Sequence, residues 1–377
     1  MKTFQEHTEE VTDQISSGNC DQALRRIIDF ALDTEQITIY KKTNAFLNWY
    51  DSHPHSEEVP GKLAQLFSEI TTELKQKEPA DRHILTTMNN WEKRYSDAFT
   101  LGPLNLEIRT GEMVGLVGEN GNGKTTLLRS LCVELKETQG ELYFLFPYTD
   151  TYDLRSKLIY IPQRTPSWRG SLLQNLLFVA ASYGYAPAES VEITELVIAR
   201  LGLRKFRGYA WKNLSSGYKM RFELARMLLR KPKILLIDEP LANLDIIAQQ
   251  TVLEDLRQIA DSPFRPLAVV LSSQQLYEVE KNSNQIIFLK NGKQQDLNRE
   301  EAKFLIIEFE TDENITDLKR KLSQLFLHSL EQNGSTFVAV FDKEMKREDF
   351  IRFCLEQAVN IVYFRDISKS SRAFFLK

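Results

Sequence analysis

The first 80 residues carry apolar side chains at spacings of three and four, the pattern of helices that bury one face. Gly18-Asn19 and Pro54 interrupt this pattern, and both are typical helix breakers. No second copy follows at a period of about 34 residues, so a bundle is favoured over a helical repeat. The sequence therefore predicts a helical domain over residues 1–80, with helices at His7 to Ser16, Asp21 to Asp33, Gln36 to Ser52 and Val59 to Gln76.

The pattern changes between residues 82 and 300, where short apolar runs alternate with helical spacing. Met113 to Val117, Ile234 to Ile237 and Ala268 to Leu271 are apolar at nearly every position. Uninterrupted runs of this length are typical of parallel strands with both faces covered. Residues 165–231 have a helical pattern instead. We therefore expect an α/β domain with a helical subdomain inserted at about 165–231.

Strand and helix patterns alternate again over residues 301–377. They predict a small α+β domain, with a ferredoxin-like arrangement. Asn333-Gly334 marks a hairpin turn. The expected strands are Phe304 to Phe309, Thr336 to Phe341 and Ile361 to Phe364, and the expected helices are Ile315 to Leu325 and Lys346 to Gln357.

Composition places the chain among soluble globular proteins, since 42% of its 377 residues are apolar and 27% are charged. A net charge of −4 argues against a protein whose main task is to bind nucleic acid. The chain turns acidic at its start, lacks a signal-peptide pattern, and has no apolar run near the roughly 20 residues that span a bilayer. Its three cysteines have no metal-ligand spacing, so we expect reduced core residues in a cytosolic protein.

A phosphate-binding motif follows the first of the buried runs. Its pattern is G-x-x-x-x-G-K-[ST], placed between a strand and a helix, which is the context this motif requires. Glycines let successive backbone N–H groups point at phosphate oxygens, while Lys124 reaches the outer phosphates and Thr125 ligates Mg²⁺. The predicted nucleotide contacts are Gly118, Glu119, Asn120, Gly121, Asn122, Gly123, Lys124, Thr125 and Thr126.

Two carboxylates end the second buried run. Asp238 and Glu239 follow Ile234 to Ile237, and the carboxyl ends of parallel strands face the ligand crevice of an open α/β sheet. We expect Asp238 to bind Mg²⁺, directly or through water. Glu239 is the predicted base that polarises the attacking water.

The segment Leu214-Ser215-Ser216-Gly217 lies between the phosphate loop and these carboxylates. Together, the three motifs resemble the ATP-binding cassette (ABC) ATPases over about residues 82–300. The implied fold is a P-loop ABC nucleotide-binding domain with a helical subdomain, preceded by a small all-α domain and followed by a small α+β domain. The end of the chain, Asp366 to Leu376, loosely resembles the tail of export-type (ABC-2) members.

The resemblance implies further site residues. Ser215 and Gly217 would contact the γ-phosphate of an ATP held by a second cassette, and Asp245 would lie across that dimer interface. Gln163 matches the glutamine that senses Mg²⁺ and water. Tyr95 stands where the family stacks an aromatic on adenine, with Phe99 as the competing position.

This chain departs from the family pattern at two places. In the Leu-Ser-Gly-Gly-Gln signature, Ser216 replaces a glycine and Tyr218 replaces the glutamine. Gln274 stands where the family has a histidine that holds the γ-phosphate and the water. Glutamine donates a neutral hydrogen bond but carries no positive charge and shuttles no proton. We therefore expect hydrolysis that is slow but present.

The resemblance implies an ATP-hydrolysing subunit of an ABC transporter, of the export type. It would close on ATP and Mg²⁺ as a homodimer, or as a heterodimer with a sister cassette. It would lie at the inner face of the membrane, attached through a separate permease subunit. Two other classes stay open: an ABC ATPase acting on ribosomes or DNA, and a slow, ATP-gated dimer switch.

Overall fold

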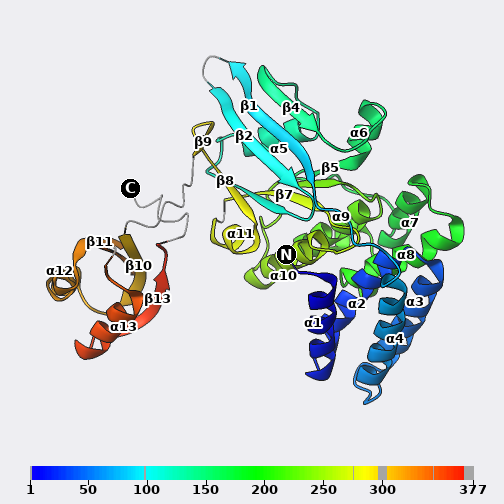
Figure 1. Cartoon of the computed structure of the whole chain (residues 1–377), viewed down its shortest axis with the longest axis horizontal. Coiled ribbons are helices and arrows are strands. Elements are labelled where there is room, and N and C mark those ends of the chain that lie inside the picture. The colour runs from blue at the N-terminus through cyan, green and yellow to red at the C-terminus, as the bar shows by residue number, and fades with distance from the viewer. Residues whose placement is uncertain (1, 97–98, 275, 296–303, 343, 369–377) are drawn as a thin grey trace. The chain divides into compact units, whose positions relative to one another are not determined.

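The structure is a computed structural model that describes residues 2–96, 99–274, 276–295, 304–342 and 344–368. It divides into two compact units, Met1–Gln295 and Asp296–Lys377. The first unit contains the four predicted N-terminal helices and two sheets (Figure 1). Over residues 304–342 and 344–368, the second unit contains one sheet and two α-helices.

The N-terminal helices confirm the predicted pattern. They are α1 (Phe4–Ser16), α2 (Cys20–Thr34), α3 (Ile37–Ser52) and α4 (Val59–Leu74). A capping box starts α1: the Thr3 hydroxyl accepts from the Glu6 backbone N–H, and the Glu6 carboxylate accepts from that of Thr3. Helices α2 and α3 also pack against α8 (Pro187–Arg200), so this bundle is joined to the rest of the unit (Figure 1).

The six-stranded sheet has the order β5-β6-β7-β3-β8-β9. Its neighbours are parallel except β8 and β9. The predicted buried runs are confirmed as β3 (Met113–Val117), β6 (Ile234–Ile237) and β7 (Ala268–Ser273), each buried along its whole length. The other strands are β5 (Leu158–Ile161), β8 (Gln285–Lys290) and β9 (Lys293–Gln295). The helices of this part are α5 (Lys124–Leu131), α10 (Ile246–Ala260) and α11 (Leu276–Asn282).

A second, antiparallel sheet with the order β2-β1-β4 was not predicted. It consists of β1 (Ile84–Ser96), β2 (Phe99–Arg109) and β4 (Gln139–Phe144), and α6 (Thr151–Lys157) follows it. Register shifts such as the one between Met88 and Trp91 interrupt β1. Since each bulge reverses the alternation of inward and outward side chains, no period of two remains to be recognised in the sequence.

The helical subdomain predicted at about 165–231 contains three helices and two short 3₁₀ turns. The helices are α7 (Leu172–Ser182), α8 and α9 (Ser216–Leu228), and the turns are η1 (Arg204–Phe206) and η2 (Trp211–Asn213). A capping box between Ser171 and Gln174 starts α7. The helical pattern of the sequence thus coincides with α7, α8 and α9.

The second unit has the element order β-α-β-β-α-β and the sheet order β11-β12-β10-β13, the split arrangement of ferredoxin-like folds. Its elements are β10 (Phe304–Thr311), α12 (Ile315–Leu322), η3 (Ser323–Leu325), β11 (Leu327–Asn333), β12 (Thr336–Asp342), α13 (Arg347–Glu356) and β13 (Ile361–Asp366). Strand β11 was not predicted, because Leu330 is its only buried residue. The export-type resemblance at Arg372 to Leu376 falls outside the described residues.

All three cysteines are free. Cys132 and Cys354 are buried, and burial raises the pKa of their thiols to about 12 and about 11. Cys20 is only partly buried at the start of α2, so the expected core location is wrong for this residue.

Within the described ranges, the structure contains no helix with the length and apolar character needed to cross a bilayer.

Candidate nucleotide site

The predicted phosphate loop joins β3 to α5 and is shaped by its glycines. Gly118 has φ +157°, and a Cβ there would lie 2.4 Å from the carbonyl oxygen of Leu289. Gly123 has φ +98° at the N-terminus of α5, where a Cβ would lie 2.7 Å from Leu101. A side chain at position 118 would meet the backbone of the strand that contains Leu289, and one at position 123 would displace the Leu101 side chain and be held at a positive φ, so the loop conformation favours glycine at both.

Lys124 is buried at the first position of α5, inside this loop. Its ammonium donates to the carbonyl oxygens of Gly118 and Glu119, at 2.6 and 3.2 Å. The Glu239 carboxylate lies 3.3 Å away. The structure therefore brings the predicted phosphate-binding cation and the predicted base into direct contact.

The Asp238 carboxylate accepts hydrogen bonds from three hydroxyl groups. Its two oxygens accept from Ser272 at 2.6 Å, from Thr125 at 2.7 Å and from Tyr160 at 3.2 Å. Burial and the Asp238 carboxylate raise the pKa of Tyr160, so this hydroxyl keeps its proton and donates it to the hydrogen bond. Thr125 and Asp238, the two expected Mg²⁺ ligands, are thus neighbours despite lying 113 residues apart.

Glu239 is held in an unusual backbone conformation, with φ +49°. Its backbone N–H donates to the Ser272 hydroxyl at 2.8 Å. Its carboxylate accepts from the backbone N–H of Gln274 at 3.3 Å. The residue at the family's histidine position therefore lies beside the predicted base, although this contact comes from its main chain.

The signature segment packs against the loop that follows Glu239. Ser215 is the N-cap of α9, and the Ser216 hydroxyl donates to the Asn243 carbonyl oxygen at 2.8 Å. Asp245 caps α10 by accepting from the Ala248 backbone N–H at 2.8 Å. Among the described residues, no hydrogen bond or ion pair joins Ser215 or Gly217 to the phosphate loop of the same chain.

Two other predicted residues, Gln163 and Tyr95, have exposed side chains. Gln163 follows the end of β5 and is exposed, next to the β6 strand that leads into Asp238. Tyr95 lies near the end of β1 and is 53% exposed, with the Lys93 ammonium 5.8 Å from its ring. An exposed aromatic ring in this position is free to stack on a planar ligand.

Sequence reasoning missed Ser272 and Tyr160 as site residues. Ser272 is fully buried and connects the Asp238 side chain with the Glu239 backbone. Each residue lies on a strand that pairs with β6, and the sequence offered no motif that could have identified either.

Comparison with known proteins gives a consistent picture. The family model described as ABC transporter matches residues 101–242. The sulfate/thiosulfate import ATP-binding protein CysA of Synechocystis sp. is 27% identical over 256 residues, covering 66% of this chain and 71% of the relative. The lipopolysaccharide export system ATP-binding protein LptB of Acidithiobacillus ferridurans is 29% identical over 206 residues, covering 53% and 84%.

Among solved structures, cbiO1 from Clostridium perfringens superposes with a TM-score of 0.52 at 23% identity, covering 56% of this chain and 87% of that one. This likeness supports the fold. The family match spans the phosphate loop, the signature segment and both carboxylates, and the relatives are ATP-binding proteins. The chain therefore contains an ABC-type ATPase domain, which the family model matches over residues 101–242.

Proposed function

We propose that this protein is the ATP-hydrolysing subunit of an ABC transporter and works as an ATP-closed dimer beside a separate membrane protein. The observation that carries the proposal is the contact of Lys124, Glu239, Asp238 and Thr125 at the carboxyl ends of β3 and β6. The relatives named for sulfate import and lipopolysaccharide export support a transport role.

Residues of the loop from Gly118 to Thr126 would hold the phosphates of ATP. Lys124 would exchange its carbonyl partners for phosphate oxygens, since anionic phosphates attract an ammonium more strongly than neutral carbonyls do. The donors around Asp238 also suit Mg²⁺: a hydroxyl and a carboxylate lie 2.7 Å apart, and both are hard oxygen ligands. When bound, Mg²⁺ neutralises charge on the phosphates.

Glu239 would act as the base. Water attacks the terminal phosphorus, the bond to the ADP oxygen breaks, and the proton of the water passes to the Glu239 carboxylate. The backbone N–H groups of Glu239 and Gln274 fix this residue: the first is bonded to Ser272, and the second donates to the carboxylate. Gln274 would donate a neutral hydrogen bond to phosphate, and Gln163 would sense the bound Mg²⁺ and water.

A second cassette would complete the site. Ser215 and Gly217 have no bond to their own phosphate loop among the described residues and would contact the γ-phosphate of the partner, while Asp245 would lie at the interface. Ile246 and Ile247, directly after Asp245, are 71% and 77% exposed, as expected of residues that a partner covers. Tyr95 would stack on adenine.

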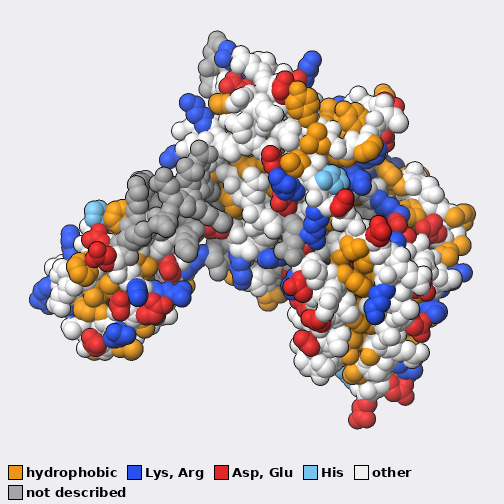
Figure 2. Space-filling model, in the orientation of Figure 1, with side chains coloured by type: hydrophobic (Ala, Val, Ile, Leu, Met, Phe, Trp, Pro, Cys, Tyr) orange, Lys and Arg blue, Asp and Glu red, His pale blue; other side chains and the backbone are white. Residues whose placement is uncertain are grey.

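Export, and attachment to a permease at the inner face of the membrane, complete the proposal. Importers and exporters both occur among the relatives, so direction rests on the loose tail resemblance alone. We also propose that the helical N-terminal domain ends near residue 80 and that the ABC ATPase domain ends near residue 300. On the face shown in Figure 2, acidic and basic side chains of the described residues are interspersed, which favours transport over binding to ribosomes or DNA.

Two measurements test the proposal. Glu239→Gln saturated with ATP and Mg²⁺ should form dimers in size-exclusion chromatography with light scattering, whereas ADP should leave it monomeric. A tagged chain extracted in mild detergent should bring with it a polytopic membrane protein. Co-purification of ribosomes or DNA instead would overturn the transport assignment, and a strictly monomeric variant would overturn the dimer, unless a sister cassette restores it.

A further inference from the structure

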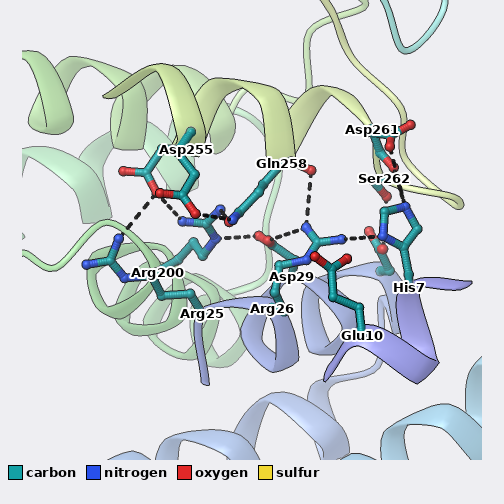
Figure 3. A network of polar contacts seen from close by, with 12 residues as sticks. His7, Glu10, Arg25, Arg26, Asp29, Arg200, Asp255, Gln258, Asp261 and Ser262 are labelled. Carbon is teal, nitrogen blue, oxygen red and sulfur yellow. Dashed lines mark hydrogen bonds and ion pairs between the residues drawn. The ribbon is translucent and has the colours of Figure 1, made fainter. Parts of the chain in front are cut away.

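A single buried guanidinium joins three helices of the first unit. Arg200 ends α8, and its side chain is fully buried. It donates to Asp29 of α2 at 2.7 Å, to Asp255 of α10 at 2.7 Å and to the Gln258 side chain of α10 at 3.0 Å (Figure 3). Burial acts to lower the pKa of Arg200, but the two carboxylates raise it, so the cation is kept.

A second tie lies beside the first. Arg26 of α2 donates to Asp29 at 3.2 Å and to the Gln258 carbonyl oxygen of α10 at 3.3 Å. Its other nitrogen lies 3.0 Å from Nδ1 of His7 on α1 (Figure 3). Because a guanidinium can only donate, Nδ1 of His7 is the acceptor, and Nε2 donates to the Asp261 carbonyl oxygen at 3.2 Å. Desolvation and Arg26 both lower the pKa of His7, in agreement with a neutral ring.

We name these seven residues the Arg200 network: His7, Arg26, Asp29, Arg200, Asp255, Gln258 and Asp261. A third tie continues it past the end of α10, where buried Asp33 of α2 accepts from Ser262 at 2.9 Å and from Arg265 at 2.8 Å. The N-terminal helices therefore hold the C-terminal half of α10 at several points.

The other end of α10 is part of the nucleotide site. Asp245 caps it, and the Gln249 amide donates to the carbonyl oxygens of Leu241 and Leu244 at 3.2 and 3.0 Å. Since an α-helix is stiff over 15 residues, a shift of its C-terminal half moves the loop from Glu239 to Asp245. Helix α8 belongs to the helical subdomain and packs against α9, whose N-cap is Ser215.

We propose that helices α1 and α2 couple the two ATP sites of the dimer by locking α8 to α10 through the Arg200 network. This inference rests on the proposed function. In a head-to-tail dimer, the catalytic loop and the signature segment of one chain serve different ATP molecules. A chain in which these two segments move as one body transmits closure at the first site to the second, which produces positive cooperativity.

Asp29 is the residue of α2 that binds Arg200 directly. Its two oxygens accept from two different guanidinium groups, Arg200 and Arg26. In Asp29→Asn, one oxygen becomes an NH₂ donor that faces a guanidinium donor, so one of the two bonds is lost in either orientation of the amide. The matched control is Glu69→Gln, which removes the same charge from an ion pair between α3 and α4, Lys42 to Glu69 at 2.6 Å, outside the Arg200 network.

The experiment measures ATP hydrolysis by the full-length protein against ATP concentration, with Mg²⁺ in excess. Wild type and Glu69→Gln should give a Hill coefficient between 1 and 2, since two sites set the upper limit, and Asp29→Asn should give about 1. A wild type without cooperativity, or an Asp29→Asn variant that keeps the wild-type coefficient, would overturn the inference.

If Asp29→Asn does not fold, as judged by its thermal unfolding transition, His7→Gln at the margin of the network decides in its place. It should lower the Hill coefficient by a smaller amount, and an unchanged coefficient would overturn the inference. Dimerisation of the Glu239→Gln variant with ATP is measured in parallel. Its absence contradicts the proposed function, whereas intact dimerisation and turnover with an unchanged coefficient contradict only the coupling role.

Discussion

The phosphate loop and the Arg200 network each bury a cation, but they bind it in opposite ways. Lys124 contacts two neutral carbonyl oxygens and one carboxylate, and its loop opens to solvent at Gly121. Arg200 is fully buried between two carboxylates and an amide oxygen. A cation with weak partners can exchange them for a ligand, whereas a cation with strong partners fixes the elements that hold it. The first unit thus contains a cation that is suited to bind a ligand, Lys124, and a cation that holds helices together, Arg200.

Removing the carboxylate of Glu239, the proposed base, should give the largest effect. Glu239→Gln keeps the size of the side chain but not its proton affinity, so ATP turnover should fall about 10²–10⁴-fold. ATP binding should remain, because the phosphate loop is intact. Phosphate release and equilibrium binding of a fluorescent ATP analogue measure the two quantities. Exposed Glu141→Gln serves as control, and a Glu239→Gln variant with wild-type turnover would remove Glu239 from the mechanism.

Arg200→Met should cost up to about 3–5 kcal/mol of unfolding free energy, since it removes the nearest buried cation from both Asp29 and Asp255. Among the described residues, only Arg26 then remains beside Asp29, and only the partly exposed Arg25 beside Asp255. Lys124→Met should cost far less, because its partners are mostly neutral carbonyl groups that water can solvate, yet it should abolish ATP binding. Denaturant unfolding of both variants tests the contrast. Equal losses of stability would show that the two cations do not differ in the way described.

A smaller gain is expected at Gln274. A histidine there supplies a charged hydrogen bond to phosphate, worth roughly 1 kcal/mol more than a neutral one, which corresponds to about fivefold faster turnover. Steady-state hydrolysis by Gln274→His measures this. Glu239→Gln combined with Gln274→His should stay slow, and a single variant no faster than wild type would contradict the expected role of Gln274.

The smallest effect should come from His7. Its pKa in the folded protein is lowered by desolvation and by Arg26, below the ordinary value of 6.5. The folded state therefore binds this proton less readily than the unfolded state does, and the stability that the neutral ring contributes is present above pH 6.5 and lost as pH falls. Thermal unfolding between about pH 5 and 8 should show a shallower acid-side decline in His7→Gln than in wild type. Parallel declines would assign the titration to other groups.

Much of the nucleotide site was predictable from the sequence, because its residues occur in short contiguous motifs whose spacing reflects a strand, a loop and a helix. Gly118 to Thr125 and Asp238-Glu239 are examples, and the structure brings Thr125, Lys124, Asp238 and Glu239 together. Ser272 and Tyr160 were missed, because a single hydroxyl on a neighbouring strand has no pattern of its own.

The Arg200 network could not be predicted, since its members come from four separate stretches of the chain and have no common spacing. His7 bonds to Arg26, and Arg200 bonds to Asp29, only because α1, α2 and α8 pack together. The helices themselves were predictable from apolar spacing. In contrast, the β2-β1-β4 sheet was hidden by the bulges of β1, which remove the alternation that identifies a strand.

The backbone conformation of Glu239 limits how far the thermal stability of this protein can be raised without loss of activity. A non-glycine residue with φ +49° costs roughly 1–2 kcal/mol relative to a relaxed conformation. Glycine at position 239 would release that cost and delete the carboxylate at the same time. Laboratory selection for heat resistance alone would therefore favour an inactive enzyme, and any screen for hardier versions must score phosphate release together with melting temperature.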